Sequence, residues 1–91
     1  MRIWGKIWNE NHLVKDITIT DDAADTRTHK ILRALEQICA AFDLSVPVWL
    51  SSNIREFKQT KKARFTQDNF VNEEIPFDYL EIQVLEEDPR A

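Results

Sequence analysis

One apolar stripe at helical spacing constrains the fold of this chain of 91 residues more than any other feature. Between residues 26 and 43 apolar side chains recur as they do on the buried face of an amphipathic helix. They are Ile31, Leu32, Leu35, Ile38, Cys39 and Phe42. A helix of this length is about 27 Å long, enough to cross three or four strands. Because the chain offers no second stripe of that length, a sheet is expected to cover the helix.

Three segments of alternating apolar and polar residues predict that sheet: 2–8, 13–20 and 77–85. The polar residues 9–12 suit a four-residue hairpin connection between the first two. The side chains expected to face the helix are Ile3, Ile7, Leu13, Ile17, Ile19, Leu80, Ile82 and Val84. The sequence therefore predicts one α+β domain over 1–91, with an antiparallel sheet of three to four strands packed on one long helix.

A short second helix is predicted near 53–60. Asn53 followed by Glu56 matches a capping box loosely, and Ile54 and Phe57 are its expected buried contacts. Beyond this helix two alternatives stay open, because the helical spacing can continue to residue 66 while residues 62–66 also alternate like a strand.

The remaining segments are predicted to be irregular. An apolar connector with Val46, Val48, Trp49 and Leu50 is expected to return the chain to the core after Pro47 has excluded helix continuation. Residues 67–76 are expected to form a loop that Phe70, Val71 and Ile75 fix to the body, and the end of the chain, EEDPRA, is expected to fray.

Composition limits the classes of protein to which the chain can belong. Cys39 is the only cysteine, so a disulfide-stapled secreted scaffold is excluded and a cytoplasmic location is expected. Its place in the apolar stripe predicts a buried, inert thiol. The segment MRIWGKIWNE lacks the apolar run of a signal peptide, and nothing in the chain approaches the length of a membrane span.

The strongest candidate binding surface is the face of the sheet that the long helix does not cover. Alternation places Trp4, Trp8 and Tyr79 there, together with Leu85 and several charged residues. Aromatic residues rimmed by charge are a common composition for a protein contact. The predicted partner is therefore another protein or a second copy of this chain. The alternative is that the connector, the second helix or the loop folds over this face.

A basic stretch suggests a second candidate. Residues 53–66 carry five basic residues and one acidic one in a chain of net charge −4. Arg55, Lys58, Lys61, Lys62 and Arg64 could contact the phosphates of a nucleic acid. Residues 67–91 carry eight acidic residues and one basic one. We therefore expect the stretch to be a solvated face, partly paired with Glu73, Glu74, Asp78 and Glu81.

Other chemistry finds little support in the sequence. Asp21, Asp22, Asp25 and His29 cluster before the long helix, but a helix cap with compensating acidic residues accounts for them better than a metal ion does. The only glycine lies inside a predicted strand, so there is no phosphate-binding loop. We expect a protein that is not an enzyme, with no catalytic residues, metal or cofactor.

Four segments carry a family resemblance: DTRTHK, PVWL, NIREFK and FDYLEIQVLEED. They resemble those of a small uncharacterised bacterial protein family of unknown function. The resemblance covers most of the chain and implies no activity, cofactor or functional residue.

Overall fold

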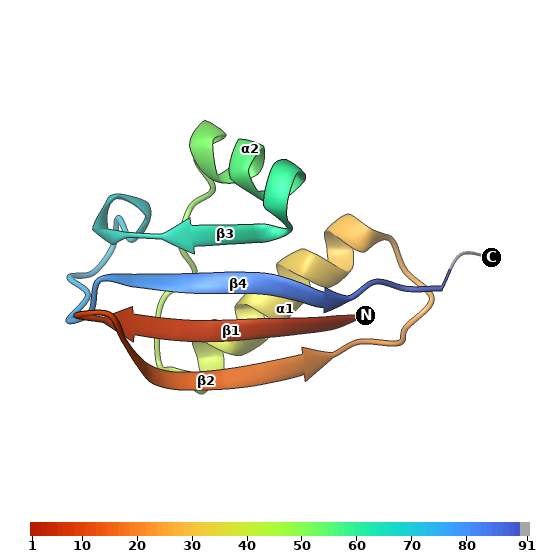
Figure 1. The fold of residues 1–91 in the computed structure, drawn as a ribbon, viewed down its shortest axis with the longest axis horizontal. Coiled ribbons are helices and arrows are strands. Elements are labelled where there is room, and N and C mark those ends of the chain that lie inside the picture. The colour runs from red at the N-terminus through yellow and green to blue at the C-terminus, as the bar shows by residue number, and fades with distance from the viewer. Residues whose placement is uncertain (90–91) are drawn as a thin grey trace.

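The computed structural model describes residues 1–89 and consists of a four-stranded sheet with two helices. The strands are β1 (Arg2–Asn9), β2 (His12–Thr20), β3 (Lys62–Phe65) and β4 (Tyr79–Glu86). The helices are α1 (Arg27–Ala41) and α2 (Ser51–Thr60), and a short 3₁₀ helix covers Gln67–Asn69. The strand order is β2-β1-β4-β3, and every neighbouring pair is antiparallel (Figure 1). The predicted α+β class, with three to four strands, a long helix and a short one, is confirmed.

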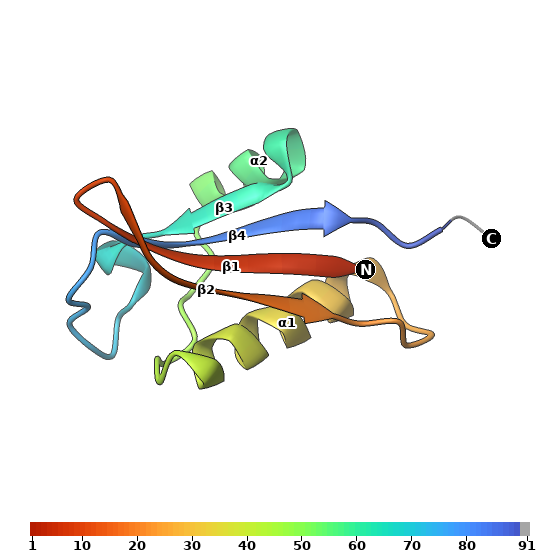
Figure 2. The ribbon, with the colours of Figure 1, turned by 60° about the horizontal axis from the view of Figure 1, so that its bottom comes forward.

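Helix α1 packs on one face of the sheet, as its stripe predicted (Figure 2). Ala34, Leu35, Ile38 and Cys39 are at most 1% exposed, and they meet the inward side chains of the strands. Gly5 of β1 lies directly under α1, because a Cβ atom at this position would be 2.6 Å from Cγ2 of Ile38. The absence of a side chain at Gly5 therefore lets the helix approach the sheet closely.

The connection between β1 and β2 is shorter than predicted. It is a two-residue turn in which Glu10 and Asn11 have positive φ angles of 51° and 63°. Such turns match the twist of a hairpin better than a four-residue loop does, and asparagine tolerates the left-handed conformation.

A bulge next to this turn overturns one predicted core position. Ile7 pairs with Lys15 while Trp8 pairs with Leu13, so Val14 is the extra residue. Paired residues point to the same face, so Leu13 lies on the side of Trp8 and is 42% exposed. The prediction that Leu13 faces the helix was wrong, because one inserted residue reverses the alternation.

Helix α1 starts one residue later than predicted and ends two residues earlier. Its cap is Thr26, whose Oγ1 accepts a hydrogen bond from the backbone N–H of His29 at 3.2 Å. The preceding aspartates do not cap it. Asp43, with φ of 57°, follows the last turn and ends the helix.

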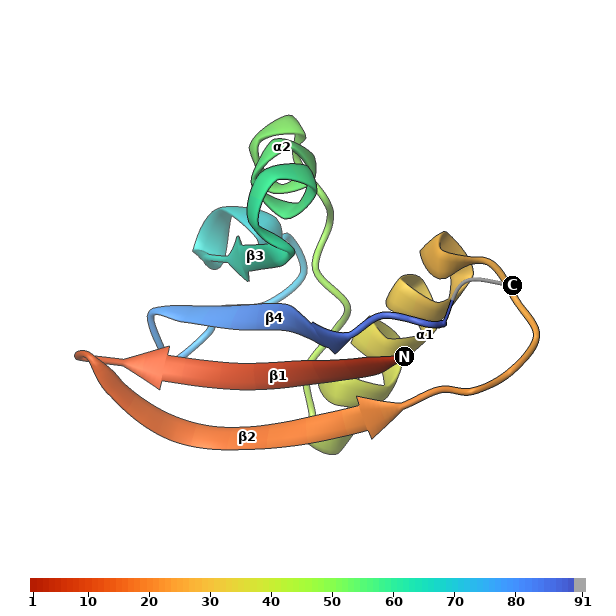
Figure 3. The ribbon, with the colours of Figure 1, turned by 45° about the vertical axis from the view of Figure 1, so that its right-hand side comes forward.

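Helix α2 and β3 form one unit at the edge of the sheet (Figure 3). Lys61, with φ of 61°, ends α2, and the chain turns at once into β3, so the alternative of a fourth strand is confirmed. Asn53 lies inside the first turn of α2 and accepts a hydrogen bond from the Leu50 N–H, so the predicted capping box with Glu56 was wrong.

The outer edge of β3 is closed by side chains of α2. The Arg64 N–H donates to Oε1 of Glu56 at 3.0 Å, and the Arg64 carbonyl accepts from Nδ2 of Asn53 at 2.7 Å. The same Asn53 accepts from Nδ2 of Asn69 at 2.7 Å, which ties the 3₁₀ helix to α2. Backbone groups of an edge strand that are paired in this way cannot bind another strand.

Several apolar residues that were expected in the core are exposed instead. Ile54 is 45% exposed and Val71 66%, and the connector leaves Val46, Val48 and Leu50 at 40% or more. Phe57 and Phe70 are buried as predicted. Trp49 is the partly buried anchor of the connector, with edge-to-face contacts to Phe57 at 5.7 Å and to Phe65 at 5.0 Å between ring centroids. Of the apolar residues in the connector, Trp49 therefore packs against the core, whereas Val46, Val48 and Leu50 remain outside it.

Residues 86–88 are held in place, in contrast to the predicted frayed tail. Glu86 belongs to β4. Glu87 accepts two hydrogen bonds from Arg27, at 2.9 and 3.0 Å, and Asp88 lies 2.8 Å from Nζ of the buried Lys30. Residues 90 and 91 of the predicted tail lie outside the described residues.

The thiol of Cys39 is buried at 1% exposure, as predicted, and burial, with a smaller contribution from the charge of Glu73, raises its pKa to about 12. The thiol therefore stays protonated at neutral pH. We expect Cys39→Ala to lower the free energy of unfolding by about 1 to 2 kcal/mol through lost packing. Chemical denaturation measures this loss. Labelling of the native protein by a thiol reagent should be slow, and labelling as fast as in the unfolded chain would contradict the burial.

Candidate functional site

The three aromatic residues predicted to form a partner surface share the face of the sheet opposite α1. We define the sheet face by Trp4, Lys6 and Trp8 of β1 and by Tyr79, Glu81 and Gln83 of β4. The antiparallel register places Trp8 beside Tyr79, Lys6 beside Glu81 and Trp4 beside Gln83. In Figure 1 the strands lie in front of α1, and no other part of residues 1–89 crosses this face.

A buried ion pair lies at the centre of the sheet face. Nζ of Lys6 is 2.9 Å from Oε1 of Glu81 and 3.0 Å from Oε1 of Gln83. The Lys6 ammonium also lies 4.0 Å from the ring centroid of Trp4 and 5.9 Å from that of Trp8. Lys6 and Glu81 are only 5% and 6% exposed. On an open face this burial is possible because the two indoles flank the lysine side chain.

The two indole N–H groups of the sheet face are also paired. The indole N–H of Trp4 donates to Asp16 at 2.8 Å, and that of Trp8 donates to Glu81 at 3.2 Å. From β3, Nε of Arg64 lies 3.5 Å from Glu81, and its guanidinium lies 5.6 Å from the Tyr79 ring centroid. Burial favours a raised pKa for Glu81, but the hydrogen bond and charge of Lys6 outweigh it, so the pKa is lowered. Glu81 is therefore ionised at neutral pH.

The basic stretch is divided between a helix and a strand. Arg55 and Lys58 lie on α2, Lys61 ends that helix, and Lys62 and Arg64 lie on β3. Arg64 contacts Glu81, which was one of the predicted partners of the basic stretch. Lys61 contacts Glu87 at 3.4 Å, and this partner was not predicted. Two other expected partners are used elsewhere: Glu73 accepts hydrogen bonds from Ser45, and Asp78 accepts one from the Glu10 N–H. The pairing predicted for Glu74 is not found among the described residues.

The acidic cluster before α1 is a set of ion pairs. Arg33 donates to Asp21 at 2.8 Å and to Asp25 at 3.0 Å, and Nδ1 of His29 lies 2.9 Å from Asp25. The Thr26 N–H, His29 and Arg33 together lower the pKa of Asp25 to about 2. Within residues 1–89, no group of three histidine, cysteine or acidic side chains could hold a metal ion.

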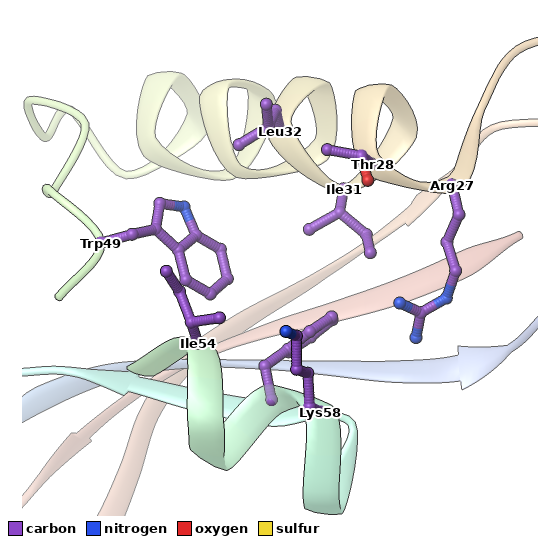
Figure 4. Close-up of a pocket in the computed structure, with 8 residues that line it drawn as sticks. Arg27, Thr28, Ile31, Leu32, Trp49, Ile54 and Lys58 are labelled. Atoms are coloured by element: carbon purple, nitrogen blue, oxygen red, sulfur yellow. The ribbon is translucent and has the colours of Figure 1, made fainter. Parts of the chain in front are cut away.

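An apolar groove between α1 and α2 was not predicted. It has a volume of about 290 Å³ and is lined by Arg27, Thr28, Ile31, Leu32, Trp49, Ile54, Phe57 and Lys58 (Figure 4). Leu32 and Ile54 are 42% and 45% exposed in its walls. Both residues belong to apolar stripes in the sequence. The residue pattern does not predict how far apart the two helices lie. Because they are separated by the groove, Leu32 and Ile54 do not cover each other and stay exposed.

Comparisons with known proteins place no restriction on the function of either surface. Family models, curated proteins and solved structures were all compared with this chain, and none matched. Neither helix in the part of the chain that the structure describes is long and apolar enough to cross a membrane.

Proposed function

We propose that this protein is a small non-enzymatic, cytoplasmic module that binds another protein or a second copy of itself through the sheet face around Trp4, Trp8 and Tyr79. One observation carries the proposal: the two indole N–H groups and the Lys6 ammonium of the face have partners within the chain, while the aromatic rings remain partly exposed. The cytoplasmic location rests on the single, buried cysteine.

Internal pairing favours a protein partner because it lowers the cost of removing water. A partner that covers this face does not have to supply hydrogen bonds for the indole N–H groups or a counter-ion for Lys6, since Asp16 and Glu81 already do so. The rings are also held in fixed positions, so little side-chain entropy is lost on binding. Tryptophan, tyrosine and arginine are the residues that most often dominate the energy of protein contacts.

A nucleic-acid-binding function through Arg55, Lys58, Lys61, Lys62 and Arg64 has weaker support. Two of these residues have carboxylate partners, and the stretch is divided between a helix and a strand. The aromatic rings lie beside Glu81 and Asp16, whose charges repel phosphates. The two functions differ in salt dependence, because phosphate contacts weaken steeply with salt and aromatic contacts do not.

The paired substitution Trp4→Thr and Trp8→Thr tests the proposed function. We expect it to weaken partner capture, or self-association in sedimentation, by at least about ten-fold, because central tryptophans are typical hot spots. Capture by the wild-type protein should persist at about 0.5 M salt, where charges are screened within a few Å. The variant Arg55→Gln with Lys61→Gln is the matched control and should bind normally.

Two results would contradict this proposal. Unchanged capture and self-association by the folded tryptophan variant would exclude the sheet face. Recovery of nucleic acid that is lost at high salt and in the basic-residue variant would favour the alternative function. Circular dichroism of each variant distinguishes lost binding from lost folding.

A further inference from the structure

The groove between α1 and α2 exposes apolar side chains that no other described part of the chain covers. Leu32 lies on α1 and Ile54 on α2, and both are more than 40% exposed on facing walls (Figure 4). Ile31, Phe57 and Trp49 complete the apolar lining. The edge-to-face contact between the Phe57 and Trp49 rings, at 5.7 Å, fixes the ring positions. An ordered apolar groove on the surface of a small protein is typical of a binding site.

Charge around the groove selects the type of partner. No acidic residue lines it, although the chain carries a net charge of −4. The Arg27 guanidinium lies 5.3 Å from the Phe57 ring centroid and is held by Glu87. Among the described residues, Lys58 has no carboxylate within ion-pair distance, and its side chain extends toward the groove in Figure 4. An acidic partner would therefore gain a charge contact that the chain itself leaves unused.

The shape of the groove fits a helix. Its two helical walls are formed by residues 27–32 of α1 and 54–58 of α2, each about 8 to 9 Å long, so the groove accommodates between one and two turns of a bound helix. A volume of about 290 Å³ accepts a few apolar side chains but not a folded surface. In a symmetric contact between two copies, each groove would meet another one whose charged lining residues, Arg27 and Lys58, are both basic, and these like charges disfavour self-association here.

We propose that the groove binds an amphipathic helix of a partner protein, one that carries acidic side chains beside its apolar stripe. The apolar stripe would pack on Leu32, Trp49, Ile54 and Phe57, and an acidic side chain would pair with Lys58. Helices that lay an apolar face into a groove are a recurring mode of recognition. The groove and the sheet face share no residue, so this inference does not depend on the function proposed above.

Two synthetic helical peptides of about four turns test the proposal. They share one leucine stripe and differ only in their flanking residues, which are glutamate in one and lysine in the other. Each is titrated into the full ¹⁵N-labelled chain and followed by amide chemical shifts. We expect shifts in α1, α2 and the connector, with the glutamate peptide binding at least about five-fold more tightly than the lysine peptide.

Substitutions in the walls complete the test. Leu32→Gln and Ile54→Gln should each lower the affinity for the glutamate peptide about ten-fold. Lys58→Gln should lower it about three-fold and should also reduce the difference in affinity between the two peptides. The exposed positions make these variants compatible with folding. Val71→Gln, a loss of an exposed apolar residue elsewhere, and the paired tryptophan variant of the sheet face should bind the peptide normally.

Several outcomes would overturn the proposal. They are equal affinity for both peptides, amide shifts that map to the sheet face, or no shifts with the glutamate peptide at millimolar concentration. Decanoate is added in a separate titration as a small anionic amphiphile. Saturable binding of decanoate in the groove, with no binding of the peptide, would assign the site to small ligands and exclude the helix.

Discussion

Glu81→Leu is expected to lower the free energy of unfolding by about 2 to 4 kcal/mol, because it leaves the buried Lys6 ammonium without its counter-ion. Lys6 then retains only Gln83 and the faces of the two indoles as partners. Lys6→Met should cost less, about 1 to 2 kcal/mol, since Glu81 keeps its contacts with Arg64 and the Trp8 N–H. Urea denaturation of each variant provides the measurement.

The double variant Lys6→Met with Glu81→Leu isolates the pair. We expect it to be more stable than Glu81→Leu alone, because an apolar pair of similar size carries no desolvated charge. Arg2→Met is the matched control, since Arg2 and Glu86 join the same two strands at 3.8 Å but are largely exposed. It should cost less than about 1 kcal/mol. A Glu81→Leu cost as small as that of the control would show that the buried pair contributes no more than an exposed one.

Acid should weaken the same pair. The pKa of Glu81 is lowered from its ordinary value of 4.5, so the folded state binds its proton more weakly than the unfolded chain does. The stabilisation is complete above about pH 4.5 and is lost as the pH falls through the lowered pKa. The stability of Glu81→Leu should therefore decline less than that of the wild type over this acidic range.

Gly5→Ala is expected to lower the free energy of unfolding by about 2 kcal/mol, although alanine is otherwise preferred over glycine in a strand. The added Cβ would lie 2.6 Å from Cγ2 and 2.8 Å from Cδ1 of Ile38, and a β-branched side chain in a helix has little freedom to move away. Thermal or chemical denaturation measures the loss.

A double-variant cycle tests this explanation. Ile38→Ala removes the three atoms that would lie nearest to the new Cβ, and alone it should cost about 2 to 5 kcal/mol through the cavity it leaves. In that background Gly5→Ala should cost nothing or stabilise the protein, because the methyl group enters the cavity. Additive costs of the two substitutions would mean that close packing with Ile38 is not the cause.

Local periodicity was sufficient to predict the main elements of this fold. The stripe that includes Leu35 and Ile38 predicted α1, and alternation predicted β1, β2 and β4 within about two residues at each end. Alternation also predicted that Trp4, Trp8 and Tyr79 share a face. These features depend on the geometry of one element at a time, which the residue pattern records directly.

The errors arose where geometry depends on two elements together. The bulge at Val14 reversed the side of Leu13, and a pattern of apolar residues contains no signal for an inserted residue. Ile54 fits a buried helical position, but the groove beside α1 leaves it exposed. The partners of Lys61 and Arg64 also lie far away in the sequence. The balance of charge predicted that the basic stretch would form ion pairs, and it named Glu81 but not Glu87 as a partner.

The closure of β3 by α2 limits how many copies of this chain could join edge to edge. Glu56 and Asn53 occupy the outer backbone groups of Arg64, so β3 cannot accept a further strand. At the opposite edge lies β2, nine residues long. Two chains that paired along β2 would form one continuous eight-stranded sheet with a closed β3 at both ends. Edge-to-edge pairing of the folded chain would therefore stop at a dimer.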